Sequence, residues 1–142
     1  MTVNQILRDK GGHIISIQET DTVLDVSKLL GEKRIGAVLV MNGDSLCGII
    51  SERDIIRGLS IRGGEVLNDT VDSLMTRSVV TCHVSDSVHS LMEMMTERRI
   101  RHVPVQEDGK IVGVVSIGDV VKVRISETEH EAEALKQYIA SA

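Results

Sequence analysis

Two serine–aspartate pairs have the residue types and spacing best suited to ligand chemistry. Ser51 precedes Asp54 by three residues, and Ser116 precedes Asp119 by the same spacing. At a helix start this pair can form a capping box, in which the hydroxyl and the carboxylate satisfy free backbone N–H groups. The same arrangement suits a phosphorylated nucleoside, because a helix N-terminus attracts phosphate and an acid one turn later can bind ribose hydroxyls. The pattern alone leaves both interpretations open.

The two pairs belong to an internal repeat. Residues 15–57 overlay residues 80–122 without a gap, at an offset of 65 residues, the distance from Ser51 to Ser116. The lead-in segments that begin at Val3 and Val71 also resemble each other, at an offset of 68. A site that recurs in both repeats has more weight than one found once. Identical positions at the first offset include Val23 and Val88, Glu32 and Glu97, Arg34 and Arg99, Ile35 and Ile100, Val38 and Val103, Val40 and Val105, and Gly48 and Gly113. These two glycines would allow a ligand to approach the backbone closely.

Each repeat has the pattern of strand, helix, strand, strand and helix. In the first repeat, apolar residues after Thr22 are spaced as one face of a helix, and Thr22 with Asp25 fits a capping box at its start. The short apolar runs 37–41 and 46–50 are typical of buried strands, and Ser51 begins a helix that we expect to end at Leu59. One such unit of about 60 residues is marginal alone, so the two should pack as one body. The predicted boundaries are residues 1–59 for repeat 1, 60–70 for a turn-rich linker, 71–125 for repeat 2 and 126–142 for a C-terminal amphipathic helix.

Composition excludes several classes of protein. Sixteen Lys and Arg residues stand against 21 Asp and Glu, with no basic tract, which argues against nucleic-acid binding. Tyr138 is the only aromatic residue, so bases have nothing to stack on. No run of about 20 apolar residues predicts a membrane span, and the mixed polar N-terminus does not resemble a secretory signal. Cys47 and Cys82 are expected to be reduced thiols in a cytoplasmic protein.

The sequence offers no positive case for catalysis. It has no Gly-x-Ser-x-Gly turn, no Walker loop and no Cys-x-x-Cys or His-x-x-x-His spacing. We therefore expect neither an enzyme, nor a metal site, nor a catalytic cofactor. Arg34 and Arg99, each just before a strand, are expected to lie on a solvated or interface surface.

The chain resembles a tandem pair of cystathionine-β-synthase (CBS) domains, or Bateman module, of the small stand-alone bacterial type. The segments that carry the resemblance are Val79–Thr81, Ile100–Val105 and Gly113–Asp119, with weaker versions at Ile14–Ser16, Ile35–Val38 and Gly48–Asp54. The resemblance implies an α+β fold in which two repeats pack as a pseudo-twofold pair. It also implies a regulatory module that binds AMP, ATP or NAD(H) in two clefts between the repeats.

In such a module each cleft takes the serine and the aspartate from one repeat and the lead-in from the other. One cleft would be formed by Ser51, Arg53, Asp54, Met75, Val79 and Val80, with Arg101 and His102 near the phosphates. The other would be formed by Ser116, Asp119, Ile14, Ile15, Gly36 and Ala37. Ser16 and Thr81 match positions near the adenine.

Charge makes the two clefts unequal. Cations are available to the first from Arg53, Arg101 and His102, whereas the second has Gly118 in place of Arg53. The first cleft is therefore expected to bind phosphates better, unless His13, Lys122 or Arg124 compensates in the second. The leading hypothesis is a sensor of energy or redox state that regulates an unidentified partner protein. The alternative is a constitutive homodimeric scaffold whose ligand sites are vestigial.

Overall fold

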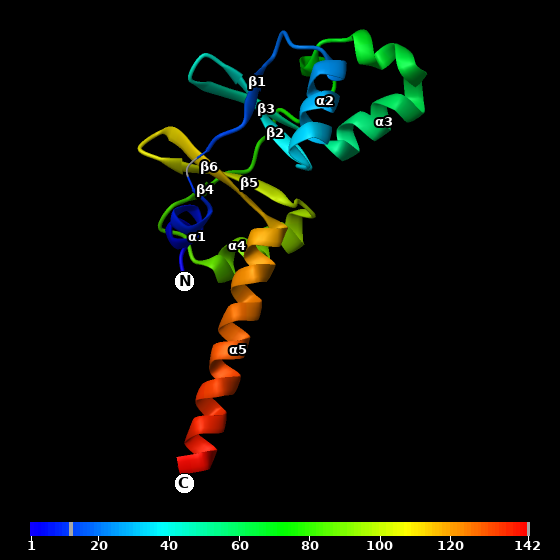
Figure 1. Ribbon diagram of the computed structural model, residues 1–142. Coiled ribbons are helices and arrows are strands. Elements are labelled where there is room, and N and C mark those ends of the chain that lie inside the picture. Colours follow the sequence, from blue (N-terminus) through cyan, green and yellow to red (C-terminus); the bar gives the residue numbers. More distant parts are fainter. Residues whose placement is uncertain (12, 142) are drawn as a thin grey trace.

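A computed structural model describes residues 1–11 and 13–141 and consists of two similar halves (Figure 1). The first half comprises α1 (Val3–Lys10), β1 (Ser16–Gln18), α2 (Val23–Lys33), β2 (Ala37–Asn42), β3 (Ser45–Ser51) and α3 (Glu52–Arg62). Two short 3-10 helices, Gly63–Asn68 and Val71–Ser73, connect it to the second half. The second half comprises β4 (Cys82–His83), α4 (Val88–Arg98), β5 (His102–Glu107), β6 (Lys110–Ser116) and α5 (Ile117–Ser141).

Each half contains a three-stranded sheet of the same topology. The first strand pairs parallel with the second, and the second pairs antiparallel with the third. Ala37 is paired with Ser51 and His102 with Ser116, so the registers coincide at the offset of the repeat. The predicted α+β fold and its order of strand, helix, strand, strand and helix are confirmed in both halves.

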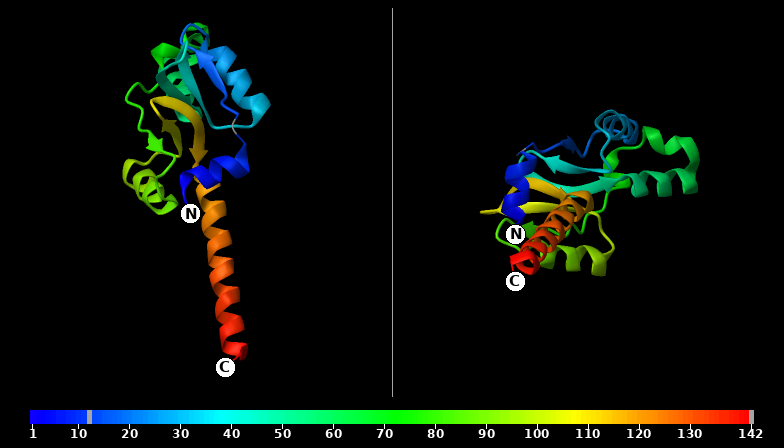
Figure 2. Two further views of the ribbon diagram at one scale, coloured as in Figure 1. Left: turned by 90° about the vertical axis from the view of Figure 1, so that its left-hand side faces the viewer. Right: turned by 60° about the horizontal axis from the view of Figure 1, so that its bottom comes forward.

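The lead-in segments are exchanged between the halves. Val3 N–H donates to the Asp86 carbonyl (2.9 Å), and α1 lies beside β6 of the second half (Figure 2). In the equivalent contact, Val71 N–H donates to the Asp21 carbonyl (2.8 Å). Apolar burial has the same arrangement: Val3 and Ile6 belong to the core of the second half, and Val71 and Met75 to that of the first. Each core is therefore completed by the other repeat, and the two halves form one body.

The two repeated glycines allow these exchanged segments to pass. A Cβ atom at Gly48 would lie 2.8 Å from both the Thr76 carbonyl oxygen and the Met75 sulfur. A Cβ atom at Gly113 would lie 2.7 Å from a methyl carbon of Leu7. The expectation that these glycines admit a ligand is wrong, because the space above each is filled by the lead-in of the other repeat.

Some boundaries differ from those predicted. Helix α1 was not foreseen, and α3 continues to Arg62, so the predicted linker 60–70 begins inside a helix and is largely helical. The expected C-terminal helix exists, but it is one with the last helix of repeat 2. No glycine or proline follows Gly118, so nothing in the sequence breaks this helix of 25 residues. Ala142, the last residue of the predicted helix, lies outside the described residues. No helix within residues 1–11 and 13–141 is long and apolar enough to cross a bilayer.

Candidate ligand-binding site

Two neighbouring cavities lie between the halves. The larger, which we name the Ser116 cleft, has a volume of about 430 Å³ and is lined by Ile15, residues 34–39, Ser116 and the end of α1. The smaller, the Ser51 cleft, has a volume of about 270 Å³ and is lined by Ser51, Arg53, Asp54 and Thr76. Both are lined by Gly36, Ala37, Ile49, Glu52, Arg101 and His102. The clefts therefore meet at a shared wall that contains Arg101 and His102.

In the Ser51 cleft, the serine and aspartate form the predicted capping box. Asp54 Oδ2 accepts hydrogen bonds from the Ser51 N–H (2.9 Å) and hydroxyl (3.1 Å), and the Ser51 hydroxyl accepts from the Asp54 N–H (3.4 Å). Asp54 Oδ1 accepts one long bond, 3.5 Å, from the Thr76 hydroxyl. The capping interpretation is thus confirmed, and it leaves one carboxylate oxygen weakly engaged at the cleft.

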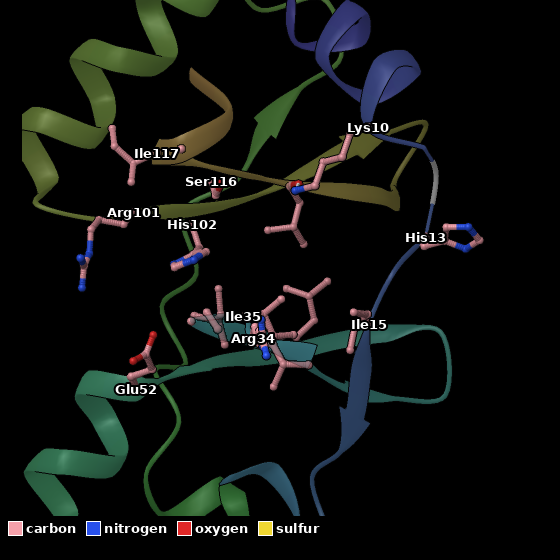
Figure 3. Close-up of a pocket in the computed structure, with 17 residues that line it drawn as sticks. Lys10, His13, Ile15, Arg34, Ile35, Glu52, Arg101, His102, Ser116 and Ile117 are labelled. Carbon is pink, nitrogen blue, oxygen red and sulfur yellow. The ribbon is translucent and has the colours of Figure 1, made fainter. Parts of the chain in front are cut away.

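In the Ser116 cleft, Lys10 of the exchanged lead-in forms an ion pair with Asp119. Asp119 Oδ2 accepts from the Ser116 N–H (2.8 Å), and the Asp119 N–H donates to the Ser116 hydroxyl (3.2 Å), as in the first repeat. Lys10 Nζ also donates to Asp119 Oδ2 and to the Val114 carbonyl, both at 2.8 Å. Figure 3 shows the Lys10 side chain reaching from α1 toward β6, above the open space of the cleft.

The ion pair and the hydrogen bonds from Ser116 stabilise the ionised form of Asp119. Burial alone would raise the pKa of this carboxyl, but hydrogen bonds from Lys10 and Ser116 outweigh it and hold the pKa below its ordinary value. Asp119 is therefore ionised at neutral pH, and its charge is compensated by Lys10.

His102 differs from the cation expected from the sequence. Burial, followed by the nearby charges of Arg101 and Lys10, lowers the pKa of His102, and the carboxylates of Glu52 and Asp119 offset this only in part. The imidazole is therefore largely neutral at pH 7 in the free protein. The permanent positive charge on the shared wall belongs to Arg101.

Ten of the predicted site residues lie around the two clefts, and the other six line neither of them. Around the two clefts lie Ser51, Arg53, Asp54, Arg101, His102, Ile15, Gly36, Ala37, Ser116 and, behind Lys10, Asp119. Six more line neither cleft: Ile14, Ser16, Met75, Val79, Val80 and Thr81. Met75 is buried against Gly48 in the core of the first half, so the following residue, Thr76, faces the cleft in its place.

Two cations of the Ser116 cleft, Lys10 and Arg34, were not predicted from the sequence. Lys10 reaches it because α1 is exchanged, and Arg34 lines it from the end of α2, where its φ of 54° is left-handed. Arg99 has the same backbone conformation at the end of α4 and lines the Ser51 cleft. Both arginines are exposed, as expected of a solvated surface, and in addition each lies at the rim of a cleft. The Ser116 cleft thus has more cations than expected, but the Ser51 cleft, lined by Arg53, Arg57, Arg99 and Arg101, remains the richer of the two.

The thiols and the acidic groups do not form a reactive centre. Burial raises the pKa of Cys82 to about 12, so its thiol is protonated at neutral pH and a poor nucleophile. In residues 1–11 and 13–141, no three histidine, cysteine, aspartate or glutamate side chains gather as metal ligands would.

Comparison with known proteins identifies the family. The family model for the CBS domain matches residues 3–61 and 71–126. The chain belongs to the CBS domain family. This CBS pair is 33% identical to the CBS domain-containing protein CBSX3, mitochondrial, of Arabidopsis thaliana, over 97% of the chain and 71% of the relative. It covers only 57% of an uncharacterized protein, MK0525, of Methanopyrus kandleri.

Solved structures of CBS pairs have the same fold. A putative signal-transduction protein with CBS domains from Burkholderia ambifaria is 41% identical, with a TM-score of 0.84 over 89% of this chain and 95% of that one. The CBS domain protein PAE2072 of Pyrobaculum aerophilum, solved in complex with AMP, is 30% identical, with a TM-score of 0.74 over 84% of this chain and 89% of that one. The CBS pair of protein MJ0100, solved with 5′-methylthioadenosine and S-adenosyl-L-methionine, is 25% identical, with a TM-score of 0.79 over 89% and 98%.

Proposed function

We propose that this CBS pair is a non-enzymatic regulatory module that binds an adenosine nucleotide in the clefts between its halves. The observation that carries the proposal is the shared wall, where Arg101 stands between two clefts: one is lined by Ser51 and Asp54 at a helix start, the other by Ser116, with Asp119 behind Lys10. A helix N-terminus and a guanidinium both attract phosphate, and a carboxylate accepts from ribose hydroxyls. Relatives with AMP, methylthioadenosine and S-adenosylmethionine support the adenosine class.

The size of the clefts favours a mononucleotide over a dinucleotide. The Ser116 cleft, at about 430 Å³, lies near the lower end of the roughly 300–1,000 Å³ range of small-molecule sites. The Ser51 cleft, at about 270 Å³, lies just below it. Among AMP, ATP and NAD(H), we therefore propose AMP as the best fit to a single cleft.

Both cysteines of the chain are free, which supports the predicted cytoplasmic location.

Removing both aspartates is expected to abolish binding. In the variant Asp54→Ala/Asp119→Ala, calorimetric titration with AMP, ATP and NADH should lose the heat of binding seen for the wild-type protein, because no acceptor for the ribose remains in either cleft. Both aspartates also complete the capping boxes from the first helical turn, where a carboxylate contributes about 0.3–1 kcal/mol. Circular dichroism must therefore show that the variant is folded at the temperature of titration. Binding of AMP by the folded double variant at wild-type affinity would disprove the assignment of the site.

A second candidate function, the homodimeric scaffold, is favoured by the uncovered faces of α3 and α5. Helix α5 buries only Val120 and Val123. Its exposed apolar residues are Ile117, Val121, Ile125, Leu135, Tyr138 and Ile139, and those of α3 are Ile56, Leu59 and Ile61. In Figure 1 the C-terminal part of α5 extends well beyond the body. Apolar side chains spaced along a projecting helix are suited to packing against a second copy of that helix.

The dimer can be tested independently of any ligand. We expect the wild-type protein to elute as a dimer in size-exclusion chromatography with light scattering, and the variant Ile125→Glu to elute as a monomer, because a charge would be buried at the contact. The control is His130→Glu, which adds a charge to the other side of α5. A monomeric wild-type protein at micromolar concentration would rule out the scaffold and leave the nucleotide module standing alone.

A further inference from the structure

Lys10 separates two cavities and hides an aspartate from one of them. It lines both the Ser116 cleft and a cavity of about 560 Å³ between α1 and α5, whereas Asp119 lines only the latter. The lysine is 41% exposed and the aspartate 23%. In the free protein, therefore, a ligand in the Ser116 cleft meets the ammonium group of Lys10 before it can reach the carboxylate.

The Ser51 cleft has no equivalent barrier. Asp54 lines that cleft directly, and no lysine or arginine forms an ion pair with it among the described residues. Lys10 lies three residues after Leu7, the side chain that crosses Gly113; three residues after Met75, which crosses Gly48, the chain has Ser78. The lysine is thus specific to one cleft of an otherwise symmetrical pair.

We propose that Lys10 determines the ligand selectivity of the Ser116 cleft, which accepts a phosphorylated nucleoside and disfavours the same nucleoside without its phosphate. This inference rests on the proposed function and deepens it. A ribose that reaches Asp119 displaces Lys10 from both of its acceptors, Asp119 Oδ2 and the Val114 carbonyl. Once a ligand covers the site, the displaced ammonium is best stabilised by a new anionic partner, because burying an ionised group without one is costly.

A phosphate supplies that partner and an unphosphorylated nucleoside does not. The 5′ side of a nucleoside monophosphate brings negative charge into a cleft that already contains Arg34 and Arg101, so Lys10 exchanges one anion for another. Adenosine displaces the lysine without compensation. A cationic nucleoside adds a positive charge to the same cluster and is disfavoured further. Lys10 is therefore a specificity-determining residue that acts both by competing for Asp119 and by binding phosphate.

The test compares AMP with adenosine. The proteins are the wild type, Lys10→Met, which keeps an unbranched side chain of similar length, and Lys122→Met, which removes a charge from α5 outside both clefts. Both variants are made in the Asp54→Ala protein, which we call the parent protein, so that only the Ser116 cleft is titrated. For Lys10→Met we expect the ratio of AMP to adenosine affinity to fall by roughly tenfold or more, since a hydrogen bond to a charged group has about that effect. Adenosine itself should bind more tightly than to the parent protein, and Lys122→Met should retain the parent ratio.

The gain in adenosine affinity is the decisive readout, because structural damage would weaken both ligands together. An unchanged ratio in Lys10→Met, or an equal loss for both ligands, would overturn the role of Lys10 while the nucleotide site stands. If neither AMP nor adenosine binds to the parent protein or to the wild type, the proposed function is refuted, and the selectivity with it.

Discussion

Replacing Arg101 by alanine is expected to weaken AMP binding in both clefts at once. Its side chain lines both cavities, and no carboxylate of the described residues forms an ion pair with it. Its guanidinium is the one permanent positive charge on the shared wall, because the pKa of the neighbouring His102 is lowered. Loss of a charge-assisted hydrogen bond costs about 1.5–3 kcal/mol, which corresponds to roughly a tenfold to hundredfold loss of affinity in each cleft.

The two clefts can be measured separately. Asp54→Ala leaves the Ser116 cleft, Asp119→Ala leaves the Ser51 cleft, and Arg101→Ala is added to each before calorimetric titration with AMP. The control is Arg98→Ala, which removes the same charge near the end of α4 and outside both clefts. The change at Arg101 leaves its backbone carbonyl in place to accept the hydrogen bond from Ile117 N–H. A loss confined to one cleft would show that the phosphates do not converge on this wall.

This shared dependence gives the module a simple form of communication. A phosphate that engages Arg101 from one cleft neutralises part of the charge available to the other, so the second ligand binds to a less positive site. With nucleotide bound in both clefts as proposed, affinity in each would depend on occupancy of its neighbour, and the coupling would be reciprocal.

The sequence predicted those parts of the fold that depend on local patterns and on the repeat. The sheets, the helix after Thr22 and the capping boxes at Ser51 and Ser116 were predictable, because alternation, apolar runs and cap residues act over a few positions. Helix α1 was not foreseen, because its stabilising contacts come from a core that begins some 80 residues later. Helix α5 was predicted as two segments, divided at residue 126 where the composition changes, although no residue there ends a helix.

Some residues of the candidate site were predictable from the sequence, but those contributed by the exchanged lead-in segment were not. The serine–aspartate pairs and Arg101 could be recognised by their position after or before strands. Lys10 could not, because its ion pair with Asp119 spans 109 positions. Arg34 resembled a surface residue because its side chain is exposed, yet it lies at the rim of a cleft. An alignment of the two lead-ins would have shown that Lys10 has no counterpart at Ser78.

Gly48 provides the sharpest test of the exchanged architecture. In the middle of β3, glycine costs roughly 0.5–1 kcal/mol relative to alanine, so from the strand alone Gly48→Ala would be expected to stabilise the protein. The exchange predicts the opposite sign, since the added Cβ would lie 2.8 Å from the backbone oxygen of Thr76. That segment is fixed by a bridge in which Ile49 and Thr76 exchange backbone hydrogen bonds of 3.0 and 2.8 Å.

We therefore expect Gly48→Ala to destabilise the protein by about 1–3 kcal/mol, the usual cost of overpacking. A fall in melting temperature of roughly 2–4 °C per kcal/mol follows for a chain of this length. Gly113→Ala is the matched variant: its Cβ would meet only the flexible end of Leu7, which can rotate away, so its loss in urea or thermal unfolding should be smaller. A Gly48→Ala protein as stable as the wild type would mean that the second lead-in does not cross β3, and the first half would then need another way to cover the core around Met75.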